Sequence, residues 1–316
     1  MDLRRIVAMR VALGAVAAWV ILTVVFLLFT LTDDWVLNAD LALMRLGDTP
    51  DEAIEAVRQQ YFQERGLDKP LWRSYLDWLA SMVTLDWGES FETGEPALSV
   101  VLAAVGRTAM YVLPGFAVAV GLGVLIGLTA ALYRHERLPG LVVVLVYIAF
   151  VAPMFWIGGL ALSLDHPQFL LRRPNHWAYT HALPIMFTAA TLLGGYVSYV
   201  RAHSLEYAGR EFTKLVRAKG ATNRRVAAHV LRNAAIPFFS MLFTEVILLL
   251  LVAVFVIEAM FGIDGFGVTF LEAARRRDLP VLLGSTIVVI ALGVVGNVIQ
   301  DVSYSYFDPR VDTGRR

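Results

Sequence analysis

The sequence has no cysteine, which excludes disulfides, thiolate zinc sites and cysteine nucleophiles. Charged residues are scarce at 17 %, against about 25 % in ordinary globular domains. Lysine occurs only as Lys69, Lys214 and Lys219, so arginine carries nearly all the positive charge. Apolar residues make up 58 % of the chain and form long runs. This composition predicts a polytopic membrane protein.

The motifs of common enzymes are also missing. The chain contains no GxxxxGK[ST] phosphate loop, no HExxH and no GxSxG, so we expect neither catalysis nor ATP binding by this chain itself. His166, His176 and His181 could converge on a metal, but they include no i, i+4 pair and no carboxylate cluster accompanies them. We therefore expect no metal site. The net charge is zero, which gives no indication of nucleic acid binding.

Apolar runs predict an all-α fold with six transmembrane helices. The first run, 11–31, is 21 residues long and exceeds the roughly 7–15 residues of a signal-peptide core, so we interpret it as a retained span. The region 98–133 is too long for one untilted span, and we predict an interfacial helix over 98–106 followed by a span from Thr108. The remaining spans are expected at 141–164 with a break at Pro153, 183–200, 238–257 and 282–307.

Between the first two spans lies a polar segment, 32–97. Its residues 33–97 carry 14 acidic and five basic side chains, and a solvated extracytoplasmic cap is a better interpretation than a metal-binding loop. We predict a helix over 51–65 with Thr49 as a possible cap. Trp72, Tyr75 and Trp78 are spaced to pack on the membrane surface or on the outer faces of the spans.

The distribution of arginine and lysine predicts the orientation. With six spans and the N-terminus inside, the inner segments hold 16 basic residues, and the short outer segments hold five. Because positive residues concentrate in cytoplasmic loops, both termini are expected in the cytoplasm. The chain then divides into an N-terminus with its first span (1–31), the extracytoplasmic segment (32–97) and a membrane core (98–316).

The stretch 205–237 holds seven basic residues and separates two apolar runs. Phe212, Leu215, Val216 and Lys219 follow helical spacing and predict an apolar stripe with a basic rim. Gly220 is placed to end that helix in the left-handed conformation. Thr222 or Asn223 is then expected to cap a second helix over 224–235, with Pro237 marking the break before the next span. An ordinary solvated basic loop remains the alternative.

This stretch resembles the cytoplasmic loop of ABC-importer permeases, and above all that of the dipeptide/oligopeptide permease family. The matching positions are Arg217-Ala218-Lys219-Gly220, Arg224-Arg225, Leu231-Arg232-Asn233-Ala234 and Ile236-Pro237. One departure is that Lys214-Leu215-Val216 stands where general importers have E-A-A. The resemblance implies that Phe212, Leu215, Val216, Arg217, Ala218, Lys219 and Gly220 form a coupling helix for a separate ATPase.

Other blocks of the chain resemble the same family in the same order. They are Gly66 to Leu71, Asp86-Trp87-Gly88, Pro153 to Gly158, Arg277-Asp278-Leu279-Pro280-Val281 and Asp308-Pro309-Arg310. Asp264 stands where the family usually has proline. The resemblance implies a second homologous permease, two ATPase subunits that bind ATP and Mg²⁺, and an extracytoplasmic solute-binding protein. It implies a solute among dipeptides, oligopeptides, nickel complexes, glutathione and oligosaccharides.

Polar residues inside the predicted spans are candidates for the solute path. Glu245 lies eight residues past Pro237, roughly 12 Å into the membrane by helix rise, and it could line the path or be a structural carboxylate. Asn297 and Asp301 share a helix face, and packing between spans is favoured over solute contact.

Two other functions fit the sequence less well. An ion-driven secondary transporter usually has inverted repeats and several deep charges, which we do not find. A membrane-bound enzyme lacks a site. A neighbouring gene for an ATPase with a phosphate loop would favour the ABC importer over the ion-driven transporter.

Overall fold

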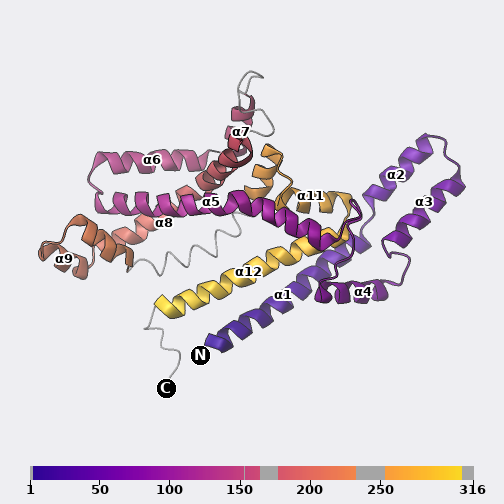
Figure 1. Cartoon of the computed structure of the whole chain (residues 1–316), viewed down its shortest axis with the longest axis horizontal. Coiled ribbons are helices and arrows are strands. Elements are labelled where there is room, and N and C mark those ends of the chain that lie inside the picture. The colour runs from indigo at the N-terminus through magenta and orange to yellow at the C-terminus, as the bar shows by residue number, and fades with distance from the viewer. Residues whose placement is uncertain (1–2, 153, 164–176, 233–252, 308–316) are drawn as a thin grey trace. The chain divides into compact units, whose positions relative to one another are not determined.

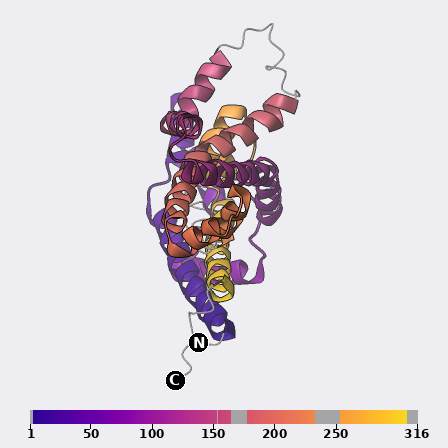
Figure 2. The same ribbon diagram turned by 90° about the vertical axis from the view of Figure 1, so that its left-hand side faces the viewer.

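The computed structural model describes residues 3–152, 154–163, 177–232 and 253–307, and most of them are helical (Figures 1 and 2). Within these ranges the β-type pairing is limited to one isolated bridge between Glu89 and Pro96. Helices are also formed by residues 223–232 and Ala253–Phe261. The named helices are α1 (Leu3–Leu31), α2 (Trp35–Leu46), α3 (Asp51–Glu64), α4 (Leu71–Thr84), α5 (Ala97–Leu132), α6 (Arg137–Val151), α7 (Met154–Ser163), η2 (Ala178–Ala182), α8 (Leu183–Ala208), α9 (Glu211–Ala218), α11 (Phe266–Arg276) and α12 (Leu279–Phe307).

Four helices in the described ranges are long and apolar enough to cross a membrane, or up to five if one bent pair counts as a span. The prediction of a helical, multi-pass membrane protein is confirmed at this level. The predicted fifth span, 238–257, lies largely outside the described residues.

The chain divides into two compact units. The first comprises Met1–Val11, Arg107–Asp264 and Leu292–Arg316, and the second comprises Ala12–Gly106 and Gly265–Ala291.

Helix α5 corrects one prediction, because it is a single continuous helix of 36 residues. We expected a break between 98–106 and a span from Thr108. Neither Gly106 nor Arg107 interrupts the helix, and Pro114 also lies inside it. Glycine costs a helix only about 1 kcal/mol, which packing can offset. The guanidinium of Arg107 donates to the carbonyl of Asp264.

Small residues at intervals of four bring α5 against α8 in the first unit. A Cβ on Gly115 would lie 2.7 Å from Thr188 Cβ, and one on Gly123 would lie 2.5 Å from Tyr196 Cβ. The same holds at Gly127, where the neighbour is Val200 at 2.8 Å. Such contacts are too short for any Cβ, so glycine is required for this approach. Without a hydrophobic drive between helices in lipid, close backbone packing of this kind stabilises their association.

The next two predicted spans, 141–164 and 183–200, correspond to α6 followed by α7 and to α8. Helix α6 ends at Val151 and α7 begins at Met154, and Pro153, where the break was predicted, lies outside the described residues. Helix α8 continues to Ala208, eight residues beyond the predicted end at Val200. It therefore carries Arg201 and Glu206 within the same helix that packs on α5.

In the second unit, α2 and α3 form an antiparallel pair (Figure 1). The carboxylate of Asp34 caps α2 by accepting from the backbone N–H groups of Val36 and Leu37, each at 3.1 Å. The first residue before α3 is Pro50, so the expected cap by Thr49 is wrong. Proline needs no acceptor for an N–H group and fits the start of a helix. Leu37, Leu41 and Ile54 form the buried core of the pair.

Helix α4 lies along the C-terminal half of α1. Phe26 stacks on Trp78 with ring centroids 4.9 Å apart and meets the edge of Tyr75 at 5.6 Å. The indole of Trp19 donates to the Tyr75 hydroxyl at 2.9 Å. Of the two placements expected for the aromatics of this region, Tyr75 and Trp78 pack on the face of a span, while Trp72 is exposed.

Candidate functional site

The first candidate site is the turn that follows α8. Helix α9 ends in a left-handed corner at Gly220, whose φ is +77°. The N–H of Gly220 donates to the carbonyl of Arg217 at 2.9 Å, and the N–H of Ala221 donates to that of Val216 at 3.3 Å. These two bonds form a Schellman motif, which satisfies the last carbonyls of a helix. The predicted glycine corner is confirmed.

A second helix leaves this corner at residue 223. The carbonyl of Thr222 accepts from the N–H groups of Arg225 and Val226. Of the two residues expected to cap this helix, Thr222 therefore occupies the N-cap position. Val226 and Val230 are fully buried, and the Asn223 amide donates to the Tyr133 hydroxyl at 3.2 Å. The second helix is therefore held by buried side chains and by a hydrogen bond to Tyr133. Figure 1 shows the pair of helices turning back from the end of α8.

The inner contact of α9 is made by a residue outside the predicted apolar stripe. Thr213 is completely buried, and its hydroxyl donates to the Tyr207 carbonyl at 2.8 Å. Phe212 and Val216 are half-buried, whereas Leu215 is 57 % exposed. The sequence pattern placed all three apolar residues on one stripe and overlooked Thr213. A threonine between apolar positions gave no signal, because its hydroxyl is satisfied by a carbonyl of the preceding helix.

The exposed side of this element is basic. Glu206 pairs with Arg210, and Glu211 pairs with Lys214 at 2.7 Å. By contrast, the exposed cations of the corner have no ion-pair partner among the described residues: Arg217, Lys219, Arg224 and Arg225. Ala218 is exposed beside them. The exposed surface around α9 thus combines Leu215 with cations that have no ion-pair partner in the described part of the chain.

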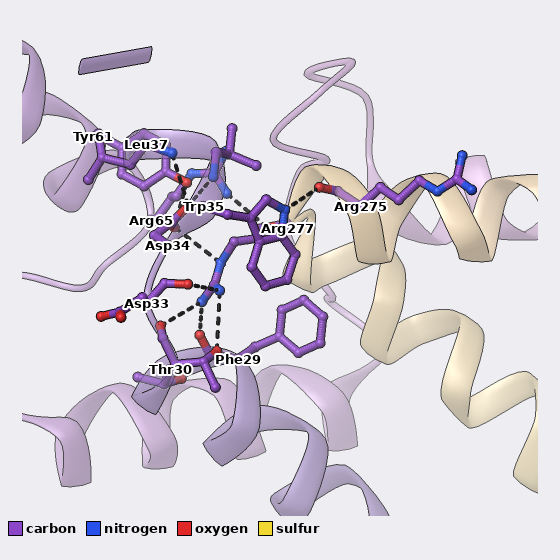
Figure 3. A network of polar contacts seen from close by, with 12 residues as sticks. Phe29, Thr30, Asp33, Asp34, Trp35, Leu37, Tyr61, Arg65, Arg275 and Arg277 are labelled. Carbon is purple, nitrogen blue, oxygen red and sulfur yellow. Dashed lines mark hydrogen bonds and ion pairs between the residues drawn. The ribbon is translucent and has the colours of Figure 1, made fainter. Parts of the chain in front are cut away.

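The second candidate site is a polar cluster around Arg277 in the second unit (Figure 3). The guanidinium is 6 % exposed and donates to the carbonyls of Phe29 and Asp33, the latter at 3.0 Å. These carbonyls lie at and just after the end of α1, so Arg277 caps the last turn of that helix. Asp34 neutralises the guanidinium at 3.2 Å, and the Trp35 ring lies 4.8 Å away.

Two side chains of α3 and its end complete the cluster. The Tyr61 hydroxyl donates at 2.7 Å to Asp34 Oδ2, the oxygen that also pairs with Arg277. Burial and this hydrogen bond to Asp34 raise the pKa of the Tyr61 phenol, which therefore stays protonated as a donor. The Arg65 guanidinium donates to the Arg277 carbonyl at 2.8 Å, and the Trp35 indole donates to the Arg275 carbonyl at 2.9 Å. Arg277 itself is left-handed, with φ +55°, and these contacts hold it there.

Asp278 performs a parallel task for α12. Its carboxylate accepts from the Ser90 hydroxyl at 2.5 Å and from the Val281 N–H at 3.4 Å. Its carbonyl accepts from the Leu282 N–H at 2.9 Å. Arg277 and Asp278, which the resemblance singled out without a role, therefore join the end of α1 and the segment around Ser90 to the start of α12. Their position indicates a structural function.

The candidate path residues are dispersed. Asp301 accepts from Arg10 at 2.6 and 3.2 Å, which links α12 to α1 within the first unit. Asn297 is exposed one turn away. Glu245 lies outside the described residues, as do His166 and His176. Another carboxylate, Glu258, is fully buried and accepts from Thr108 and Tyr111. Across the described ranges, no three His, Asp or Glu side chains gather in a way that could hold a metal.

Comparison with known proteins gives consistent matches. Residues 123–313 match the family described as binding-protein-dependent transport system inner membrane component. The chain is 29 % identical to the oligopeptide transport system permease protein AppB of Bacillus subtilis over 82 % of this chain and 86 % of the relative. It is 28 % identical to a putative peptide permease protein of Brucella suis over 95 % of this chain and 96 % of the relative.

A third relative is the dipeptide transport system permease protein DppB of Lactococcus lactis, 29 % identical over 83 % of this chain and 86 % of the relative. The family match covers more than half of the chain and includes α8, α9 and the Gly220 corner. The chain therefore belongs to the family of inner membrane components of binding-protein-dependent transport systems, the permease subunits of ABC transporters.

Proposed function

We propose that this chain is a permease subunit of an ABC importer for peptides or similar small solutes, and that it couples to a separate ATPase through residues 205–237. The observation that carries the coupling is the α9 corner, where the exposed Leu215 lies among cations that have no ion-pair partner within the described ranges. The peptide class is supported by the names of the relatives, which are oligopeptide and dipeptide permeases.

In this proposal α9 enters a groove of the ATPase and transmits its motion to α8. The link between them is short, because the Thr213 hydroxyl is bound to the Tyr207 carbonyl. The cations Arg217 and Lys219 face acidic residues of the ATPase groove and guide docking. Hydrolysis belongs to that subunit, which binds ATP and Mg²⁺.

The full assembly comprises this chain, a second homologous permease, two ATPase subunits and an extracytoplasmic solute-binding protein. The six-span topology places both termini and 201–237 in the cytoplasm and 32–97 outside. It rests on the excess of basic residues in the short inner segments, 16 against five.

The topology is tested by single-cysteine labelling, because the chain has no native cysteine. In intact cells, a membrane-impermeant maleimide is expected to label Asp51→Cys, on exposed α3, and to leave Ala221→Cys unlabelled until the cells are opened. Labelling of the Ala221 variant in intact cells would contradict the orientation.

The path is proposed to include Glu245, with Asn297 and Asp301 as further candidates. A carboxylate inside the membrane costs several kcal/mol unless it faces protein or water, on the order of 2.5–3.5 on insertion scales. Glu245→Gln is expected to insert normally and to change the uptake kinetics of at least one peptide. Unchanged kinetics for every tested solute would assign Glu245 a structural role.

The transport function itself is tested in proteoliposomes. The complex contains this chain, its permease partner, the ATPase subunits and the binding protein. It is expected to accumulate labelled peptide only when ATP is present on the side of the membrane where the ATPase subunits lie. Accumulation driven by an imposed ion gradient without ATP would instead support the ion-driven alternative.

A further inference from the structure

The α9 corner, taken as residues 211–225, is small for a stable contact between proteins. Seven residues are exposed among 211–220, and four more are exposed among 221–225. A standard protein–protein interface engages about 20–30 residues of each partner. An ATPase that stays bound to this chain therefore needs further exposed residues beside the corner.

The turn between α5 and α6 lies directly beside the corner. The Asn223 amide, at the start of the second helix, donates to the Tyr133 hydroxyl at 3.2 Å. Tyr133 is the first residue after α5, and it belongs to the same compact unit as the corner. In the chain, Arg134 follows Tyr133 and Arg224 follows Asn223, so this hydrogen bond joins two basic segments.

The packing of α5 and α6 holds this turn in place. The N–H of Glu136 donates to the carbonyl of Tyr133 at 2.9 Å, which closes the turn. Behind the turn, Ala130 of α5, Val143 of α6 and Val197 of α8 form one buried cluster. This cluster fixes the turn relative to α8, the helix that leads into the corner.

The turn resembles the corner in its exposure and its charge. Residues 134–138 are all exposed. Arg134 and Arg137 have no carboxylate at ion-pair distance in the described part of the chain, as is also the case for the exposed cations of the corner. Glu136 is the one acidic residue of the turn, so the combined surface stays positive. A partner that fits both surfaces presents carboxylates to them.

We propose that the turn 133–138 is a second contact surface for the same ATPase subunit. The proposal rests on the proposed function, which places the ATPase at the α9 corner. Anionic lipid headgroups have the charge of such a partner, but the contact with Asn223 and the area that a stable interface needs favour the ATPase. Because the turn joins α5 to α6, the ATPase then holds these two helices as well as α8.

Cross-linking from single cysteines tests the position of this contact, since the chain has no cysteine of its own. In the assembled transporter, benzophenone maleimide attached at His135→Cys is expected to yield an adduct with the ATPase, as at Leu215→Cys. Asp264→Cys is the matched control, because Asp264 is exposed in a loop of the same unit. In the proposed topology it lies on the opposite side of the membrane, and no adduct with the ATPase is expected from it.

Charge reversal tests the chemistry of the contact. The ATPase subunit is titrated onto the permease pair in nanodiscs. The double variant Arg134→Glu/Arg137→Glu is expected to bind it about tenfold more weakly, because two exposed ion pairs become repulsive contacts. The difference is expected to shrink at high salt, which screens exposed charges. Glu136→Gln, in the same turn, is the control and is expected to bind at least as tightly as the wild type.

The outcomes separate this proposal from the function on which it rests. An adduct from position 215 without one from position 135 would overturn the second contact and leave the coupling through α9 intact. Adducts of position 135 with lipid alone, together with unchanged binding of the charge-reversed variant, would show a membrane contact and would also overturn the proposal. A complex that contains the ATPase but gives no adduct from either position would contradict the coupling through α9 as well.

Discussion

Gly220 provides a quantitative test of the coupling element. A Cβ at this position would meet no atom within 4 Å, so a substitution introduces no clash. The cost is that of a left-handed backbone at φ +77°, about 1–2 kcal/mol for a residue with a β-carbon. That cost lowers the equilibrium constant for forming the Schellman corner by a factor of roughly 5–30. A β-branched residue lies at the upper end, whereas asparagine tolerates this conformation.

The assay measures co-purification of the ATPase and solute-stimulated ATP hydrolysis in liposomes with the loaded binding protein. We expect Gly220→Val to insert normally and to lose most of both signals, and Gly220→Asn to retain most of them. Gly209→Ala is the control, because Gly209 has φ −82° and its nearest neighbours would lie at 3.6 Å from a Cβ. Wild-type signals for Gly220→Val, or equal losses for valine and asparagine, would refute the reasoning.

Two other substitutions test the packing of the units. Gly123→Val places a side chain where Tyr196 Cβ would lie 2.5 Å away, so it is expected to prevent α5 from packing on α8. The yield of folded protein, measured by size-exclusion chromatography, is expected to fall. Gly121→Val is the control, because its Cβ would meet no atom within 4 Å, and it is expected to behave as wild type. Arg277→Lys cannot reach the same set of acceptors and is expected to destabilise the chain by about 2 kcal/mol in thermal unfolding, whereas Arg276→Lys, which is exposed, is expected to change it by less than about 0.5. Equal behaviour within either pair would contradict the corresponding contact.

Local features of the coupling element were predictable from the sequence. A glycine after a short amphipathic helix, followed by Thr222, specifies a left-handed corner and a new helix by backbone preference alone. Thr213 was missed because its burial depends on the carbonyl of Tyr207, a contact with another helix. The length of α5 was misjudged because the region was divided by the length of one untilted span, which a continuous helix of 36 residues exceeds.

The Arg277 cluster was beyond sequence reasoning. It unites residues 29–35, Tyr61, Arg65 and Arg277, which are more than 200 residues apart at the extremes. The resemblance singled out Arg277 and Asp278 but assigned neither of them a partner. The cap that Asp34 provides for α2 could have been predicted from the sequence, because an aspartate before an apolar-periodic segment is a typical helix start.

The central claim is that α9 contacts the ATPase. Leu215 is 57 % exposed on α9, and the chain has no cysteine, so Leu215→Cys gives a single reactive position. In the assembled transporter, a short maleimide cross-linker at this position is expected to yield one adduct that contains this chain and the ATPase subunit. Asp51→Cys, on α3, is expected to yield no such adduct. An assembly in which the ATPase co-purifies, but is cross-linked from position 51 and not from position 215, would contradict the account.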